Sequence, residues 1–278
     1  MKIINLKKKS LNTKDYVKRS AKRSDFKTLI KHDCILKHDD KIIGVYIVMP
    51  KTSIRVLNAI LKIDFGSGNK RSAGMRSKSR IFGNMPRDTM RKDYCSSTAL
   101  AYDYSKEHHI ICNYARELTK LYKKHCREVF DKHNNISKEK VKKTWIMNDS
   151  PFTSGIINKN SALNYHFDNG NFKDVYSNML AYNKDIDGGY LALPEYDVGL
   201  EIANNSVLFF DGQKILHGVT EIKYKSPNSY RFTLVYYTLH RMWQCLEPSE
   251  ELDRIKKVKT EREVGRLKRL KGEIKNEI

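Results

Sequence analysis

His166 and Asp168 have the types and spacing of two metal ligands, and they lie at the end of a predicted strand. Alternate residues of a strand point to the same face, so His166 and Asp168 project together while Phe167 turns to the other side. An imidazole and a carboxylate placed in this way supply two ligands of the facial triad that holds non-haem iron(II). The second histidine of the triad is expected at His217, on a later β-like segment. The sequence therefore predicts an iron site formed by these three side chains.

Arg231 follows His217 by fourteen residues and opens the apolar run RFTLVYYTL. A guanidinium at this position can bind the distal carboxylate of 2-oxoglutarate through two parallel hydrogen bonds. The charges of the loaded site then cancel, since iron(II) and Arg231 are positive and Asp168 and the doubly negative cosubstrate are negative. A neutral site favours binding in a pocket of low dielectric constant. Taken singly, His217 could be a buried core histidine and Arg231 the partner of an ordinary ion pair. Taken together and in this order, they predict a site for iron(II), 2-oxoglutarate and O2.

The elements that must position these residues are predicted to be short strands. Residues 145–246 contain apolar runs broken by turn residues, a spacing typical of a β-sandwich or barrel and not of alternating βαβ units. Two earlier runs rich in Ile and Val, 42–49 and 55–64, are also predicted as strands. Between residues 97 and 133, apolar positions recur every three or four residues and predict an amphipathic helix. The expected fold class is mainly β with flanking helices.

Composition divides the chain into four parts. We expect a basic, weakly patterned N-terminal arm (1–40), an α+β part with an Arg/Gly-rich loop and the long helix (41–144), a catalytic β core (145–246) and a charged C-terminal helix (247–278).

Positive charge is concentrated in the segments that flank the predicted core. The net charge of the chain is +21. Residues 1–31 carry eleven Lys/Arg against two Asp, 62–92 nine against two, and 116–144 ten against four, whereas 145–246 carry eight against ten. Such Lys-rich stretches can be simple solvated faces. Because the excess recurs in three separate segments, we expect the flanks to hold a phosphate-rich polymer, with nucleic acid as the leading partner.

The cysteines show neither CxxC pairs nor the Cys/His spacing of a zinc module, so we expect reduced thiols and no zinc site. The five cysteines are Cys34, Cys95, Cys112, Cys126 and Cys245.

No run approaches the roughly 18 apolar residues of a membrane span, and the Lys-rich start lacks the apolar stretch of a secretory signal. We therefore expect no membrane association and a cytoplasmic protein, or a nuclear one in a host cell. Abundant Lys, Ile, Asn and Tyr are typical of an AT-rich genome and suggest a virus or phage. The sequence gives no indication of oligomeric state.

The region from about 145 to 245 resembles the oxygenase domain of the TET/JBP family, which hydroxylates the 5-methyl group of pyrimidines in DNA. The similarity is carried by the runs TSGIINKNSALNYHFDNGNFKDVYSNMLAY, GGYLALPEYDVGLEIANNSVLFFDGQKILHGVTEI and YRFTLVYY. The upstream run FGNMPRDTMRKDYCSST is similar to the smaller microbial and viral members. The resemblance implies a double-stranded β-helix core of the jelly-roll or cupin-like kind. It also assigns the iron to His166, Asp168 and His217 and the cosubstrate to Arg231.

The resemblance implies further residues around the substrate. Asn171 matches a group that contacts the target base, Thr233 a small hydroxyl residue beside the cosubstrate, and Tyr237 a tyrosine of the base pocket. The family's histidine after that tyrosine falls here at Leu239, and His240 follows one position later. His240 is kept as a candidate for base recognition, although one residue along a strand reverses the face.

This chain lacks the cysteine-rich zinc-binding region of the animal enzymes, so contacts with DNA are expected from its basic segments. Arg71, Arg76, Arg80 and Arg87 cluster in the Arg/Gly-rich loop, where they could bind phosphates. One of these arginines could instead complete the 2-oxoglutarate site.

The expected substrate is DNA that contains a 5-methylpyrimidine, with 5-methylcytosine converted to 5-hydroxymethylcytosine and further oxidation left open. Thymine in DNA, RNA, a free nucleotide or a protein side chain are alternatives with the same chemistry. Basic flanks argue against a free nucleotide, since a small substrate needs no extended cationic surface. A non-enzymatic nucleic-acid-binding protein with a relic barrel is the alternative of another class, and the complete set of ligand residues argues against it.

Overall fold

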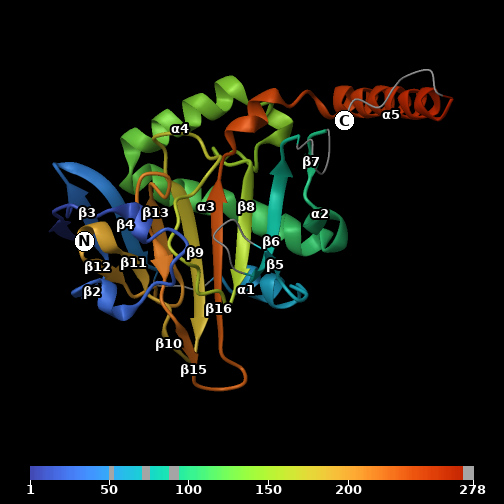
Figure 1. The fold of residues 1–278 in the computed structure, drawn as a ribbon. Coiled ribbons are helices and arrows are strands. Elements are labelled where there is room, and N and C mark those ends of the chain that lie inside the picture. Colours follow the sequence, from blue (N-terminus) through green and yellow to red (C-terminus); the bar gives the residue numbers. More distant parts are fainter. Residues whose placement is uncertain (50–52, 71–75, 88–93, 272–278) are drawn as a thin grey trace.

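Ten strands form one large sheet in this computed structural model, which describes residues 1–278 except 50–52, 71–75, 88–93 and 272–278 (Figure 1). Neighbouring strands of the sheet pair antiparallel apart from the first two, which are parallel. Its order is β1 (Lys2–Asn5), β3 (Cys34–His38), β4 (Lys41–Val48), β13 (Ser206–Phe210), β9 (Ser177–Lys184), β16 (Tyr230–Tyr237), β8 (Ser154–Lys159), β6 (Arg76–Met85) and β5 (Asn69–Lys70), and β7 (Ser96–Ser97) pairs with β6.

A second sheet of four short strands faces one side of the large sheet, and an apolar cluster with residues from both sheets fills the space between them. The order of the second sheet is β14 (Gly218–Val219), β11 (Leu191–Leu193), β12 (Val198–Leu200) and β2 (Thr28–Ile30). A separate two-stranded ribbon joins β10 (Ile186–Gly188) to β15 (Ile222–Tyr224). Two facing sheets of this kind form the double-stranded β-helix that was expected from the sequence.

Helices cover the other side of the large sheet, as Figure 1 shows. They are α1 (Ile54–Leu61), α2 (Ala99–Asp103), α3 (Ser105–His125) and α4 (Arg127–Lys140), whereas α5 (Pro248–Leu270) projects away from the body. Single 3-10 turns lie at η1 (Thr13–Asp15), η2 (Arg23–Asp25), η3 (Lys143–Trp145), η4 (Pro194–Tyr196) and η5 (His240–Gln244).

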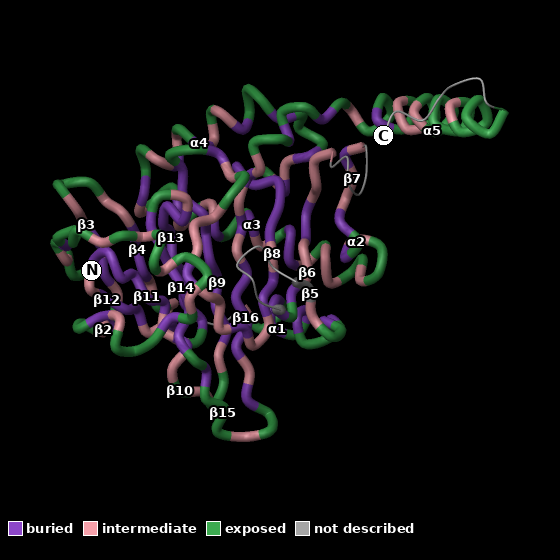
Figure 2. Tube along the Cα trace, in the orientation of Figure 1, coloured by how far each residue is buried: buried purple, intermediate pink, exposed green. Residues whose placement is uncertain are grey.

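Strand β16 shows how the sequence separates the two sides of the sheet. Phe232, Leu234 and Tyr236 pack into the cluster beneath the helices. Arg231 and Thr233 alternate with them and face the space between the two sheets. Because a strand has a period of two, apolar residues on one face leave the intervening positions free for chemistry. Both faces are covered, so most of the strand is buried (Figure 2).

Five expectations about the elements were wrong. Arg76 and Arg80, expected in the Arg/Gly-rich loop, belong to strand β6. His166 and Asp168, expected at the end of a strand, lie outside the regular strands, where His166 forms an isolated bridge with His217.

The run 55–64 contains helix α1, because its apolar residues also recur at helical spacing and pack against α3. The single helix expected over 97–133 is three helices, and α3 ends where Cys126 leaves the helical conformation. The first 40 residues, expected as a weakly patterned arm, contribute β1, β2 and β3 to the two sheets. The charged C-terminal helix is present as α5.

The expectation of five reduced cysteines was also wrong, because Cys95 and Cys245 form a disulfide. The two residues are 150 positions apart and are brought together only by the fold, so no spacing motif in the sequence predicts the pair. Cys34, Cys112 and Cys126 are free and buried, and burial raises the pKa of the Cys34 thiol to about 11 and of the other two to about 12. Among the described helices, none is long and apolar enough to cross a membrane.

Candidate iron centre and its pocket

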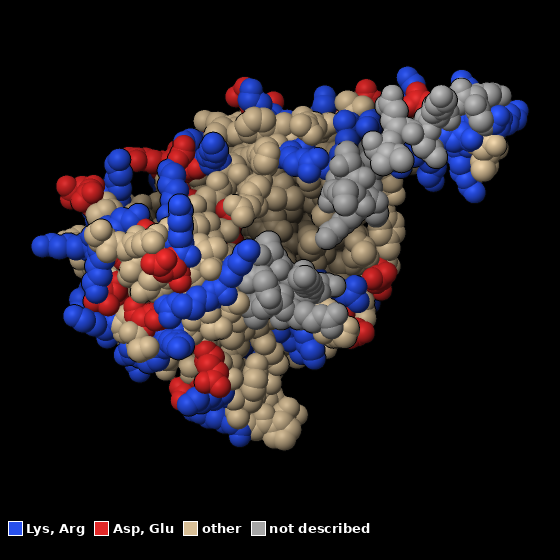
Figure 3. Space-filling model, viewed as in Figure 1, with Lys and Arg blue, Asp and Glu red and all other residues tan. Residues whose placement is uncertain are grey.

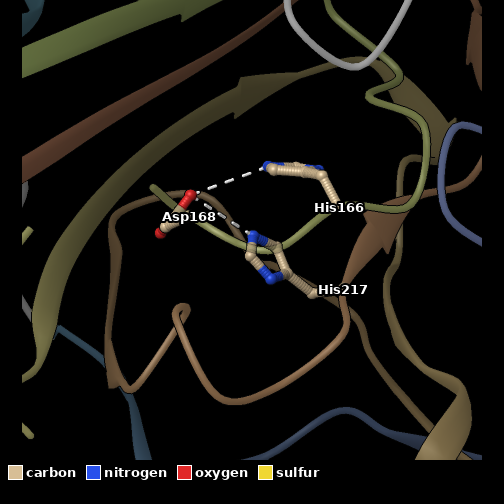
Figure 4. A group of neighbouring side chains, drawn as sticks. All are labelled: His166, Asp168 and His217. Carbon is tan, nitrogen blue, oxygen red and sulfur yellow. Dashed lines mark ion pairs between the residues drawn. The ribbon is translucent and has the colours of Figure 1, made fainter. Parts of the chain in front are cut away.

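The structure brings His166, Asp168 and His217 together, as the sequence predicted (Figure 4). The Nε2 atoms of His166 and His217 lie 3.7 and 3.8 Å from the same carboxylate oxygen, Oδ1 of Asp168. One possible ligand atom from each residue lies within 4.8 Å of the others. Two imidazole nitrogens and one carboxylate oxygen converging from one side leave further coordination positions open, which suits non-haem iron(II).

Backbone hydrogen bonds outside the regular strands hold the three ligands. The amide of His166 donates to the carbonyl oxygen of His217 at 2.9 Å, and the amide of His217 donates back at 3.1 Å. The amide of Asp168 donates to the carbonyl oxygen of Gly212 at 2.9 Å. Gly212 leaves room for the carboxylate, because a Cβ atom at this position would lie 2.3 Å from Oδ2 of Asp168 and would displace it.

Both histidines are oriented through their second ring nitrogen. Nδ1 of His166 lies 2.7 Å from the carbonyl oxygen of Asn164, and Nδ1 of His217 lies 2.9 Å from that of Ile215. A carbonyl oxygen only accepts, so each Nδ1 carries the proton and donates it. Nε2 of each ring therefore keeps a lone pair directed at the centre, which is the usual arrangement of metal-binding histidine.

Arg231 lies in the same pocket and is fully buried. Its Nε and Nη2 atoms have no hydrogen-bond partner among the described residues. Burial lowers the pKa of Arg231 to about 10, so the side chain stays charged at neutral pH. A buried guanidinium without a partner is costly, and an anionic ligand that occupied the pocket would remove that cost. The residues present therefore fit both iron and a dicarboxylate.

The pocket has a volume of about 210 Å³ and also contains Asn158, which the sequence analysis missed. Asn158 on β8 is the register partner of Thr233 on β16, and its Nδ2 donates to Oγ1 of Thr233 at 3.4 Å. Oδ1 of Asn158 is buried without a partner among the described residues. A polar residue in the apolar run SGIINK, two positions from the lining residue Ile156, is the only sequence signal that points to it.

The residues expected at the target base divide into two groups. Asn171 and Tyr237 line the pocket, and Nδ2 of Asn171 donates to Oγ of Ser177 at 3.1 Å. His240 is exposed, and its Nδ1 lies 3.0 Å from the carbonyl oxygen of Gly170. Leu239 lines the pocket in its place, as expected from a shift of one residue.

Two of the four arginines expected to bind phosphate have other partners in the described part of the chain. Nε of Arg80 donates to the carbonyl oxygen of Asp64 at 2.8 Å, and Nη1 lies 3.4 Å from Asp103. Arg87 forms an ion pair with the buried Glu251 of α5 at 2.6 Å. Arg71 and the side chain of Arg76 lie outside the described residues. Strand β6 and the C-terminal helix thus use Arg80 and Arg87 for internal contacts.

A double-stranded β-helix with this triad and a buried arginine in one pocket defines the class of oxygenases that use iron(II) and 2-oxoglutarate. Comparison with protein families agrees: residues 87–240 match the Tet_JBP family, described as the oxygenase domain of the 2OGFeDO superfamily. The match covers more than half of the chain, and the chain belongs to this family.

Relatives and solved structures extend the comparison. The chain is 26% identical over 232 residues to thymine dioxygenase JBP1 of Trypanosoma brucei brucei, which covers 80% of this chain and 27% of the relative. It is 22% identical over 225 residues to the bifunctional helicase and thymine dioxygenase JBP2 of Leishmania braziliensis, covering 77% and 20%. The match thus spans about a quarter of the length of these relatives. The structure of NgTET1 in complex with 5mC DNA shares the fold, with a TM-score of 0.62, 15% identity and coverage of 91% and 89%.

Proposed function

We propose that this protein hydroxylates the 5-methyl group of 5-methylcytosine in DNA. The observation that carries the proposal is the buried, unpartnered guanidinium of Arg231 in one pocket with the converging His166, Asp168 and His217. Membership of the family and the net charge of +21 support DNA as the substrate. Thymine in DNA is the second candidate, because JBP1 and JBP2 are named thymine dioxygenases.

When bound, iron(II) with 2-oxoglutarate and O2 supplies oxidative hydroxylation, in which one oxygen atom enters the substrate and the other enters succinate as CO2 is released. His166, Asp168 and His217 would hold the iron, and Arg231 would bind the distal carboxylate of 2-oxoglutarate by charge and by its paired N–H groups. Thr233 lies two residues after Arg231 on the same face of strand β16, and its hydroxyl would bind the cosubstrate.

Asn158 would complete the cosubstrate site. Amide oxygen and nitrogen are assigned from hydrogen bonding, so a rotated amide accepts from Thr233 and turns its N–H groups towards the pocket. This arrangement satisfies Oδ1, which is otherwise buried without a partner. It also adds a neutral donor beside Arg231 for the carboxylate.

The target base must leave the helical stack to reach a pocket between two sheets. Asn171 and Tyr237 line this pocket and can meet the hydrogen-bonding edge of a pyrimidine. A carboxamide both donates and accepts, so Asn171 can pair with the amino group of cytosine or the carbonyl group of thymine. The same side chain therefore suits either base.

The test is anaerobic loading with iron(II) and 2-oxoglutarate, followed by aerobic incubation with duplex DNA that contains 5-methylcytosine. Mass spectrometry of the digested nucleosides then measures 5-hydroxymethylcytosine and 5-hydroxymethyluracil in the same sample. His166→Ala is the control. Formation of 5-hydroxymethylcytosine by the parent alone supports the proposal; 5-hydroxymethyluracil alone assigns thymine instead, and succinate without either product rejects DNA methylpyrimidines.

A further inference from the structure

A basic segment at residues 14–27, here named the basic rim, lies outside the part of the chain that matches the family. It carries six Lys/Arg side chains against two Asp. Apart from the turns η1 and η2 it has no regular structure, and the two sheets do not require it for their hydrogen bonding. Its position and its charge therefore call for a separate explanation.

The basic rim is attached directly to the segments that carry the iron ligands. The amide of Lys18 donates to the carbonyl oxygen of Tyr165 at 2.8 Å, and the amide of Tyr165 donates to that of Arg19 at 2.9 Å. Tyr165 immediately precedes His166. A parallel bridge joins Ala21 to Thr220, three residues after His217. The rim thus borders both histidine-bearing segments.

Two partly buried charges of the rim, Arg19 and Asp25, make internal contacts. The guanidinium of Arg19 forms an ion pair with Asp25 at 2.9 Å and lies over the rings of Tyr16 and Tyr165 at 4.3 and 5.5 Å. The hydroxyl of Tyr165 donates to the same carboxylate at 3.0 Å. Arg19 and Asp25 therefore neutralise each other and fix the rim in place.

Lys14, Lys18 and Lys22 are exposed, and none of them forms an ion pair with any residue in the part of the chain that the structure describes. Figure 3 shows a hollow in one face of the molecule and, to its left, many Lys and Arg side chains interspersed with Asp and Glu. Three ammonium groups in water, on a segment whose backbone is bonded to Tyr165 and Thr220, gain little from the fold itself. A polyanion laid along this edge would release counterions from each contact.

We propose that Lys14, Lys18 and Lys22 bind the phosphodiester backbone of the DNA strand that delivers its base to the iron pocket. This inference rests on the proposed function and adds the surface that holds the strand. The lysines contact phosphates, so they contribute affinity and orientation without reading sequence. The phosphate contacts are therefore assigned to the basic rim and not to Arg80 and Arg87, because the guanidinium groups of those two arginines have internal partners.

The test compares two triple variants with equal changes in charge. K14Q/K18Q/K22Q removes the rim lysines, and K120Q/K123Q/K124Q removes three exposed lysines of α3, the helix on the opposite side of the large sheet. Binding to a fluorescent 5-methylcytosine duplex is measured by anisotropy between 50 and 200 mM KCl, values chosen to span roughly the range in which phosphate contacts dominate. The affinity of each protein for 2-oxoglutarate, measured anaerobically with Mn(II), reports an intact pocket.

For the rim variant we expect weaker DNA binding and a slope of log K against log salt that is smaller by roughly 2 to 3, about 0.9 for each lost phosphate contact. Its 2-oxoglutarate affinity stays within about twofold of the parent, and the α3 variant keeps most of the parental slope. A rim variant with the parental slope, or an equal loss in the α3 variant, overturns the assignment while leaving the proposed function intact. A parent that binds 2-oxoglutarate but neither binds nor oxidises the duplex overturns both.

Discussion

His166 and His217 bind each other through the backbone, each amide donating to the other's carbonyl oxygen. Their rings stand 4.3 Å apart between centroids, and each ring is held by a carbonyl oxygen at its Nδ1 atom. The ligand geometry is therefore built into the chain before any metal arrives. Metal binding to such a preformed site needs little reorganisation. Removing a single ligand should therefore lower the metal affinity without changing the rest of the site.

Replacing Asp168 by Ala should strongly weaken metal binding without unfolding the protein. The carboxylate supplies the only negative charge of the triad, whereas the backbone amide that ties residue 168 to Gly212 is kept. We expect at least a 100-fold loss of Mn(II) affinity by calorimetry. Circular dichroism should be unchanged. Parental Mn(II) affinity in this variant would show that the ion is held elsewhere.

Gly212→Ala should weaken the metal site from a position that is not itself a ligand. The new Cβ atom would lie 2.3 Å from Oδ2 of Asp168, so the carboxylate must move. We expect roughly a 10- to 100-fold loss of Mn(II) affinity.

Gly265→Ala on the exposed helix α5 provides the control, because the nearest atom to its Cβ is 4.0 Å away. This substitution should leave metal affinity unchanged and stabilise the helix slightly. Equal metal affinity in the two alanine variants would contradict the role assigned to Gly212.

Replacement of Arg231 by Met should remove stabilisation by 2-oxoglutarate. In the parent with Mn(II), cosubstrate at 100 times its Kd should stabilise the fold by about 2.7 kcal/mol, which raises Tm by roughly 5 to 10 °C. R231M should show no such rise, yet without cosubstrate it should be at least as stable as the parent, because it removes a buried charge without a partner. Differential scanning calorimetry measures both. A parental rise in Tm for R231M would place the cosubstrate elsewhere.

These residues could be found from the sequence because their signals are local. His166 and Asp168 were found from their types and spacing, although the strand expected to carry them is only an isolated bridge at His166. Arg231 lies near the start of an apolar run that does form a strand. Asn158 was missed because its significance depends on two features that appear only in the fold. One is its cross-strand register with Thr233, and the other is its buried Oδ1 atom, which has no hydrogen-bond partner among the described residues. A missing partner has no sequence pattern.

Long-range contacts were likewise out of reach. Arg87 was predicted to bind phosphate because arginine clusters attract anions, but the carboxylate it meets belongs to Glu251, more than 160 residues later. The same holds for the Cys95–Cys245 disulfide. In α1, the branched side chains typical of strands were overridden by packing against α3.

Asn158→Ala should raise KM for 2-oxoglutarate by about tenfold, the effect of one lost hydrogen bond to a charged group, with a smaller change in kcat. Steady-state kinetics on the DNA substrate, with calorimetric titration of 2-oxoglutarate, measures both. Asn158→Gln retains the amide but extends it, and should recover less than the parental affinity. An unchanged affinity for 2-oxoglutarate in N158A would reduce Asn158 to a partner of Thr233.

Arg87→Met should destabilise the protein, because it strips the charged partner from a carboxylate that is only 2% exposed. Burial alone would raise the pKa of Glu251, but hydrogen bonds from Arg87 and from the amides of Leu246 and Cys95 outweigh it, and the pKa lies below its usual value. Losing the partner of a buried pair costs about 3 kcal/mol. Urea unfolding at pH 7 measures this loss.

The exposed pair of Arg127 and Asp131 on α4 is the matched control, and R127M should cost only about 0.3 to 0.5 kcal/mol. The pH dependence gives a second check. Since the folded pKa of Glu251 is depressed, its ionised form stabilises the fold above the unfolded pKa of about 4.3, and this contribution disappears as the pH falls through the lower folded value. The parent should therefore lose more stability than R87M over that interval, and parallel acid profiles would mean that Arg87 does not set the ionisation of Glu251.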